Sequence, residues 1–322
     1  MAANQTHSHA HGILEPRIFS TQAGIRVIQV SFGALLATSL FQFLIFLFSG
    51  SIALLSDTIH NIGDAATAIP LWFAFSFGRR RPTTRFTYGL GRLEDLAGLV
   101  IVLMIPASAV AAGYESIQRL FYPKPVENLW LVMGAAAAGF LGNEAVAVLR
   151  IRVGRKIGSA ALVADGYHAR ADGFTSLAVL VGALGIRLGY PLADPIAGIL
   201  IAATILRIGW LSGKTVLARL LDGVDPEIVD EIRRAATDAD GVKEVSEVSV
   251  RWLGHRLLAE INIAVPPEFS VEKGHEIANR ARHELLHHLS YLTQATIHVD
   301  PIGASGEKHH KIANHFPGDE RS

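Results

Sequence analysis

Apolar residues gather in six long stretches that follow one another through the first two thirds of the chain. Each stretch exceeds the roughly 20 residues that a helix needs to cross the hydrocarbon core of a bilayer. Their ranges are 26–49, 52–77, 93–118, 128–149, 160–187 and 192–213. The first stretch begins too late and runs too long for a cleaved signal peptide, so we interpret it as a retained helix. The pattern predicts an all-α transmembrane domain of six helices within residues 16–214.

The loops between these stretches differ in charge. Basic residues follow the second, fourth and sixth stretches, whereas the opposite loops hold little charge beyond Lys124. These basic residues are Arg79, Arg80, Arg81, Arg85, Arg150, Arg152, Arg155, Lys156, Lys214 and Arg219. Because basic loops stay in the cytoplasm, an even number of spans places both termini there. We therefore expect a multi-pass protein of the cell (plasma or inner) membrane.

The pattern changes after the sixth stretch to one typical of a small soluble domain over residues 215–303. Asp225 and Pro226 are suited to the N-cap and first position of a helix, and Ser270 begins another helix. Apolar and polar residues alternate, as in half-buried strands, near 248–252, 261–265 and 295–300. The order α-β-β-α-β predicts a compact α+β module. The polar tails, 1–15 and 304–322, are expected to be disordered.

Composition supports this division of the chain. Half of the residues are hydrophobic, only 18% are charged and the mean hydropathy is +0.33, which is too apolar for disorder. The 29 basic and 29 acidic residues balance, and this balance argues against a nucleic-acid partner. The 322 residues contain no cysteine. A metal site in this chain must therefore be built from His, Asp, Glu or backbone oxygen, and disulfides and thiolate zinc fingers are excluded.

The second and fifth apolar stretches each contain the motif D-x-x-H-x-x-x-D, in segments where ionisable groups are costly. The two motifs consist of Asp57, His60 and Asp64 and of Asp165, His168 and Asp172. Residues four apart lie on one face of a helix, so each motif presents one imidazole and one carboxylate in the same direction. Both histidines lie roughly 12 Å from a span end, near the middle of the membrane.

The four side chains of His60, Asp64, His168 and Asp172 converge if the two helices face each other. Two nitrogens and two carboxylate oxygens suit tetrahedral Zn²⁺, whereas Mg²⁺ and Ca²⁺ take six or more oxygens. An ion site near mid-membrane indicates transport. The alternative is that these residues only tie two helices together by hydrogen bonds.

Neighbouring charged residues allow more than one interpretation. Asp57 and Asp165 lie on the same faces one turn away, and they can act as second-shell partners of the ligands or cap and hydrate a helix end. Arg170 points away from His168, and either snorkels or pairs with a neighbouring acid.

With these motifs the sequence resembles the cation diffusion facilitator family of divalent metal transporters. The resemblance extends to Tyr88-Gly-x-Gly-Arg-x-Glu94 before the third span, to Asp194-Pro195 at the start of the sixth, and to a ferredoxin-like or metallochaperone-like cytoplasmic domain. It implies a homodimer that exports metal from the cytoplasm in exchange for protons, with Zn²⁺ as the substrate. The His-plus-Asp form of the motifs resembles the zinc-preferring branch, and an Fe²⁺, Cd²⁺ or Co²⁺ exporter of the same family is the alternative.

The resemblance also implies sites outside the spans. His275, His298 and Asp300 match a regulatory zinc site of the cytoplasmic domain, to which His255 could add a ligand, although Asn262 stands where a further His would be expected. We expect no second site before the third span, because Thr83, Phe86 and Leu90 occupy its positions. Arg92 and Asp222 match a charge pair that links the third span to the cytoplasmic domain across the dimer.

Two further hypotheses place the chain in other classes of protein. His283-Glu284-x-x-His287 fits the H-E-x-x-H motif of zinc hydrolases, but a small module lacks the third ligand and the cleft, so we predict a solvated helix face and no enzyme. The other hypothesis is a metal-responsive membrane scaffold that binds metal ions without transporting them.

Overall fold

A computed structural model describes residues 14–49, 68–122, 129–289 and 291–305. The chain divides into two compact units, the first of which comprises Arg17–Leu221, whereas the second contains the chain from Asp222 onward. The division lies beyond the predicted boundary at 214/215, because the last helix of the first unit continues to Leu220.

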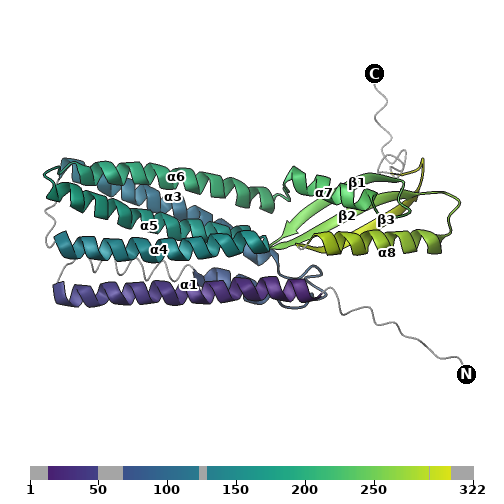
Figure 1. The fold of residues 1–322 in the computed structure, drawn as a ribbon, viewed down its shortest axis with the longest axis horizontal. Coiled ribbons are helices and arrows are strands. Elements are labelled where there is room, and N and C mark those ends of the chain that lie inside the picture. Colours follow the sequence, from purple (N-terminus) through teal and green to yellow (C-terminus); the bar gives the residue numbers. More distant parts are fainter. Residues whose placement is uncertain (1–13, 50–67, 123–128, 290, 306–322) are drawn as a thin grey trace, which may run out of the picture. The chain divides into compact units, whose positions relative to one another are not determined.

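The first unit is entirely helical (Figure 1). Its long helices are α1 (Leu14–Ser49), α3 (Arg92–Phe121), α4 (Leu129–Ile157), α5 (Ala160–Arg187) and α6 (Ala193–Leu220). Among the described residues, these five helices are long and apolar enough to cross a membrane, and a shorter apolar helix covers Ala68–Gly78. That short helix falls at the end of the predicted second span, and residues 50–67 lie outside the described part of the chain. The predicted fold class is confirmed.

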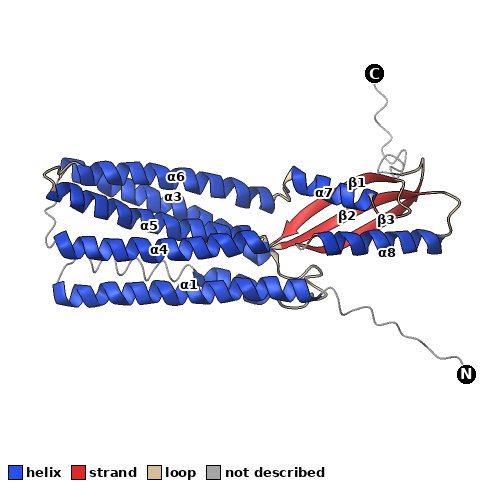
Figure 2. Cartoon of the chain, viewed as in Figure 1, coloured by secondary structure: helices blue, strands red, loops and turns tan. Residues whose placement is uncertain are grey.

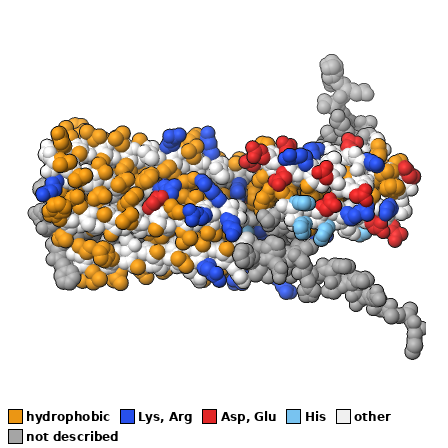
Figure 3. Space-filling model, viewed as in Figure 1, with side chains coloured by type: hydrophobic (Ala, Val, Ile, Leu, Met, Phe, Trp, Pro, Cys, Tyr) orange, Lys and Arg blue, Asp and Glu red, His pale blue; other side chains and the backbone are white. Residues whose placement is uncertain are grey.

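Large apolar side chains cover the outside of this unit (Figure 3). Leu103 of α3, Leu200 of α6 and Trp210 of α6 are each more than half exposed in the isolated chain. Such a surface is unfavourable in water and is stable against lipid. The unit is therefore an integral, multi-pass membrane domain.

Helices α4 and α5 approach each other closely through glycine. A Cβ atom on Gly166 of α5 would lie 2.9 Å from the backbone nitrogen of Ile151 in α4. A Cβ on Gly154 of α4 would lie 2.9 Å from the backbone nitrogen of Val163 in α5. Small residues at helix crossings allow this approach in membranes. On its other side α5 packs against α3 and α6, so α5 lies at the centre of the unit.

The second unit contains two helices and three strands (Figure 2). These are α7 (Pro226–Thr237), β1 (Glu244–Leu253), β2 (Arg256–Val265), α8 (Val271–His288) and β3 (Leu292–Pro301). The sheet order is β1-β2-β3, with β1 antiparallel and β3 parallel to β2. This is the predicted order of elements. The predicted cap at Asp225 forms, because its side chain accepts a hydrogen bond from the backbone N–H of Glu227. Helix α8 begins after Ser270, whose side chain caps it by accepting a hydrogen bond from the backbone N–H of Lys273.

The core of the second unit lies between its helices and the sheet. Ile232 of α7 and Ile277 of α8 are fully buried in one cluster with Ile261 and Ile263 of β2. Burial of a side chain of this size contributes about 1.5–3 kcal/mol. The module therefore has a hydrophobic core of its own.

Candidate metal centre

The polar motif of the fifth span forms one buried stripe along α5. Asp165, His168 and Asp172 are 0%, 2% and 2% exposed. His168 Nε2 and Asp172 Oδ2 lie 3.8 Å apart, too far for a direct hydrogen bond. A Zn²⁺ ion binds imidazole nitrogen at about 2.0–2.1 Å and carboxylate oxygen at about 2.0–2.2 Å, so one ion can reach both atoms. The spacing of four residues thus produces a pair of side chains that a single cation can bridge.

The matching half of the predicted site, His60 and Asp64, lies outside the described residues, as does Asp57. The four-ligand set therefore stays a prediction, and the structure describes the geometry of His168 and Asp172.

Asp165 forms a buried ion pair with α4. Its Oδ2 lies 3.0 Å from Nη1 of Arg150, and the two side chains are 0% and 1% exposed. Sequence reasoning placed Arg150 in the loop after the fourth span, and that placement is wrong because α4 continues to Ile157. Arg152, Arg155 and Lys156 still end this helix with positive charge. The pair joins α4 to α5 one turn from His168.

A second ion pair crosses the same helix interface. Arg170 donates from Nε to Glu144 Oε2 at 3.0 Å and from Nη2 to Glu144 Oε1 at 2.6 Å. Of the two roles predicted for Arg170, snorkelling and pairing with a neighbouring acid, the structure shows the pairing. Such a two-pronged contact fixes the orientation of both side chains. Two ion pairs and several close glycine contacts therefore hold α5 against α4.

A small polar cavity of about 90 Å³ opens between α3, α5 and α6. Arg119 of α3 lies 3.1 Å from Asp194 of α6 and 2.8 Å from Glu115. Thr175 of α5 also lines the cavity, and its hydroxyl donates to the carbonyl of Asp172 at 2.7 Å. The conspicuous Asp194 at the start of the sixth span thus forms an ion pair with α3.

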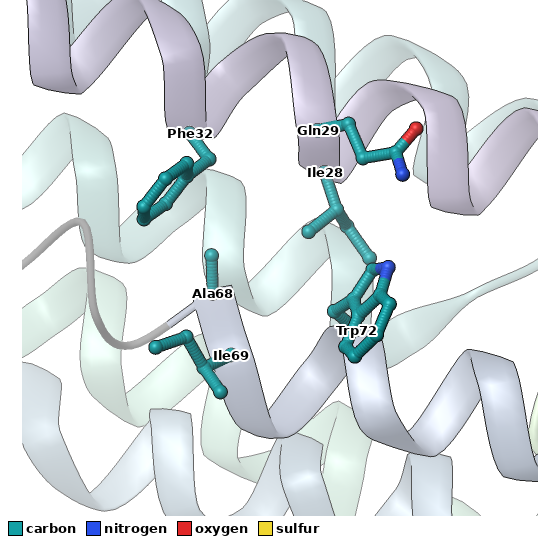
Figure 4. Close-up of a pocket in the computed structure, with 6 residues that line it drawn as sticks. All are labelled: Ile28, Gln29, Phe32, Ala68, Ile69 and Trp72. Carbon is teal, nitrogen blue, oxygen red and sulfur yellow. The ribbon is translucent and has the colours of Figure 1, made fainter.

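A larger cavity of the first unit measures about 220 Å³ and lies between α1 and the helix Ala68–Gly78 (Figure 4). The described residues that line it are Ile28, Gln29, Phe32, Ala68, Ile69 and Trp72. Among these described residues there is neither a carboxylate nor an imidazole.

The second unit brings two of its predicted ligands together. His298 Nε2 lies 2.9 Å from Asp300 Oδ1 on β3, and Ser305 Oγ donates to Asp300 Oδ2 at 3.3 Å. His275 is exposed on α8, and His255 is buried at the turn between β1 and β2. In the described parts of the chain, no three His, Asp or Glu side chains are grouped closely enough to hold a metal ion. His275 and His255 therefore do not complete a site with the pair in this single chain.

The interdomain pair stays a prediction. Arg92 donates from Nη1 to the carbonyl of Arg219 at 3.2 Å and lies 3.6 Å from Asp95, so it fastens the start of α3 to the end of α6. Asp222, at the start of the second unit, has a positive φ of 60°.

The H-E-x-x-H motif lies on the outer face of α8. His283 and His287 are exposed, with ring centroids 6.2 Å apart, and Glu284 is half-buried. These side chains belong to a helix whose opposite face covers the sheet.

Two family models match most of the chain. Residues 28–221 match the family model described as the cation efflux transmembrane domain, and residues 224–302 match that of the cation efflux protein cytoplasmic domain. A probable cation efflux system protein of Mycobacterium tuberculosis is 51% identical over 92% of this chain and 89% of its own length. The zinc transporter ZitB of Escherichia coli is 29% identical over 94% of this chain and 99% of its own.

The magnetosome protein MamB of Magnetospirillum gryphiswaldense is 25% identical over 87% of this chain and 94% of its own. Together with the helices of the first unit, these matches define a membrane transporter of divalent metal cations and not an enzyme. The chain belongs to the cation efflux family, which confirms the resemblance stated from the sequence motifs.

Proposed function

We propose that this protein exports Zn²⁺ from the cytoplasm through a mid-membrane site formed by His60, Asp64, His168 and Asp172. The observation that supports this most strongly is the burial of His168 and Asp172 on one face of α5, 3.8 Å apart. Ionisable groups inside a membrane helix are costly, and they are retained where they serve an ion or proton path.

The ligand set favours zinc. Two imidazole nitrogens and two carboxylate oxygens match the tetrahedral preference of Zn²⁺, and the chain offers no thiolate for softer ions. The name of the relative from E. coli, a zinc transporter, points the same way. Fe²⁺, Cd²⁺ and Co²⁺ remain the alternative substrates, because imidazole and carboxylate ligands also bind these ions.

Protons are the proposed counter-ion. Imidazole and carboxylate bind metal only when deprotonated, so metal and protons compete for the same lone pairs. A site open to the cytoplasm loads Zn²⁺ and releases protons, and a site open to the outside takes up protons and releases Zn²⁺. Histidine suits such an exchange, because its ordinary pKa of about 6.5 lies near physiological pH.

The proposed assembly is a homodimer in the cell membrane with both termini in the cytoplasm. The match of residues 224–302 supports the dimer, because the name of the matched family model, ZT_dimer, refers to a dimer. The basic residues after the second, fourth and sixth spans support the orientation. The cytoplasmic pair His298 and Asp300 is proposed as part of a regulatory zinc site that a single chain leaves incomplete.

The test is zinc uptake into vesicles that contain the purified protein, with and without an imposed pH gradient. Antiport predicts that uptake accelerates when the gradient drives protons out of the vesicle as zinc enters, and that collapsing the gradient with an ionophore removes the acceleration. If zinc uptake does not depend on the pH gradient, protons are not the counter-ion. Saturable zinc binding without any uptake would favour the alternative that the protein is a metal-responsive membrane scaffold.

A further inference from the structure

Arg207 of α6 is an exposed basic residue inside a membrane span. Helix α6 begins at Ala193, and Arg207 follows about 14 residues later, which is about 21 Å along the helix axis. With the start of α6 at one surface of a hydrocarbon core of about 30 Å, Arg207 lies about 9 Å from the other surface. A charged side chain at this depth is costly unless an opposite charge meets it.

The helices around Arg207 do not supply that charge. In the part of the chain that the structure describes, no hydrogen bond or ion pair joins Arg207 to another residue. The one acid of α6 is Asp194, which lies about 20 Å away along the axis and pairs with α3. The acids near the starts of α3 and α5, which are Glu94, Asp95 and Asp165, are at most 5% exposed. The counter-charge of Arg207 therefore comes from outside these helices.

A second basic residue and a tryptophan lie on the same side of α6. Arg207 and Lys214 are seven residues apart, which is two helical turns, so their side chains project in nearly the same direction. The opposite side of the helix, with Gly209 and Val216, is buried against α3. Trp210 is 68% exposed, and Nζ of Lys214 lies 5.3 Å from the centroid of its ring. Figure 3 shows basic side chains over α6 at the upper edge of the first unit, surrounded by apolar ones.

From this arrangement we infer that Arg207, Trp210 and Lys214, the basic face of α6, bind the phosphate headgroup of an anionic phospholipid. The lipid belongs to the leaflet in which α6 ends. Lys214 lies about 10 Å further along the axis than Arg207, at the level of the membrane surface. Because arginine carries its charge on a long apolar stem, Arg207 can extend toward the same phosphate from below. Tryptophan is enriched at this membrane–water interface.

A second copy of this chain is the alternative occupant of the basic face. A two-fold contact through this face would bring two identical basic surfaces together. Helix α6 has no acid on this side to neutralise them, whereas an anionic leaflet attracts each basic residue near its surface. The lipid therefore matches the charge of this face better than a second copy does. The lipid site needs none of the residues proposed to carry zinc, so it stands or falls independently of the proposed transport.

The experiment is native mass spectrometry of the full-length protein in detergent micelles, titrated with phosphatidylglycerol or with phosphatidylcholine. Arg207→Gln and Lys214→Gln each remove one charge, and Arg207→Lys keeps the charge. Arg152→Gln is the matched control, because Arg152 is an exposed arginine near the end of another helix, α4. Soluble glycerol 3-phosphate, added in competition, distinguishes a lipid site from a site for free phosphate groups.

We expect wild type to bind phosphatidylglycerol more tightly than phosphatidylcholine. The dissociation constant for phosphatidylglycerol should rise about 5-fold in Arg207→Gln and about 5-fold in Lys214→Gln, which is the usual contribution of one basic residue near an anionic membrane surface. The double variant should show about 25-fold weaker binding, because the two positions are far enough apart for their effects to add. Arg207→Lys and Arg152→Gln should bind the lipid as wild type does.

Four outcomes overturn the lipid site. Dissociation constants within about two-fold of wild type in both Arg207→Gln and Lys214→Gln would show that the basic face does not bind the lipid. An equal loss in Arg152→Gln would show that any basic residue at the rim of the unit has this effect. Displacement of the lipid by an equal concentration of glycerol 3-phosphate would assign the face to free phosphate. A wild-type dimer that becomes a monomer in Arg207→Gln would assign the face to the contact between subunits.

Discussion

Replacing Asp165 by asparagine removes the charge that faces Arg150 in the interior of the helical unit. Nη1 of Arg150 and Oδ2 of Asp165 lie 3.0 Å apart, and both side chains are almost fully buried. At an effective dielectric constant of about 20, two unit charges at this separation attract by about 5.5 kcal/mol. The cost of desolvating both ions offsets much of this attraction, so the net stability that the intact pair provides is small.

The single variants should nevertheless be severe, because each leaves one charge buried and uncompensated. We expect Asp165→Asn and Arg150→Met each to lower the free energy of unfolding by about 3–5 kcal/mol. The double variant Arg150→Met/Asp165→Asn removes both charges, and should be less destabilised than the sum of the single variants by about 2 kcal/mol or more. Arg152→Met, at an exposed position near the end of α4, is the control and should stay within about 0.5 kcal/mol of wild type.

The assay is detergent-induced unfolding of the purified protein, followed by circular dichroism at helical wavelengths. A double-mutant cycle with no coupling, or single variants that are no less stable than Arg152→Met, would refute the view that this pair lies buried between α4 and α5.

Two further predictions concern the interface between α4 and α5 and the module formed by the second unit. Gly166→Ala should lower the unfolding free energy by about 1–3 kcal/mol in the same assay, because the new Cβ would lie 2.6 Å from Cγ1 of Ile151. Gly134→Ala, where nothing lies within 4 Å, should be neutral, and equal effects of the two substitutions would contradict the close packing. In the module, burial and a 2.9 Å hydrogen bond to Glu231 raise the pKa of Tyr291 from 10.0 to about 12. The raised pKa favours the protonated phenol in the folded state, so this contribution to stability is complete below pH 10.0 and is lost as the pH rises to about 12. Tyrosinate absorbance, taken as the difference from Tyr291→Phe, should titrate near the upper value and move part of the way down in Glu231→Gln; an unchanged midpoint in Glu231→Gln would refute the role of the hydrogen bond.

The architecture could be predicted from periodicity because long apolar stretches and alternating strands are local signals. The order of elements in the module, the cap at Asp225 and the start of α8 at Ser270 followed from such signals. Boundaries were harder to place, since α6 continues past Lys214 to Leu220 and α4 continues past Arg150 to Ile157. A span predicted from hydropathy ends at the first charged residues, whereas the helix itself continues until its backbone hydrogen bonds end.

The site could be predicted only in part. His168 and Asp172 stood out because ionisable groups are rare in apolar stretches. Arg150 was misplaced because sequence alone cannot tell a loop arginine from one that a buried carboxylate neutralises.

The central claim, that His168 and Asp172 carry the transported cation, is tested most directly by zinc uptake into vesicles that contain equal amounts of wild type, Asp172→Asn or Asp230→Asn. The substitution at Asp172 removes one ligand charge at constant size, and Asp230→Asn makes the same change at an exposed acid of α7 in the second unit. We predict that Asp172→Asn folds and inserts as wild type does but loses zinc uptake, whereas Asp230→Asn retains it. Undiminished uptake by Asp172→Asn would contradict the claim.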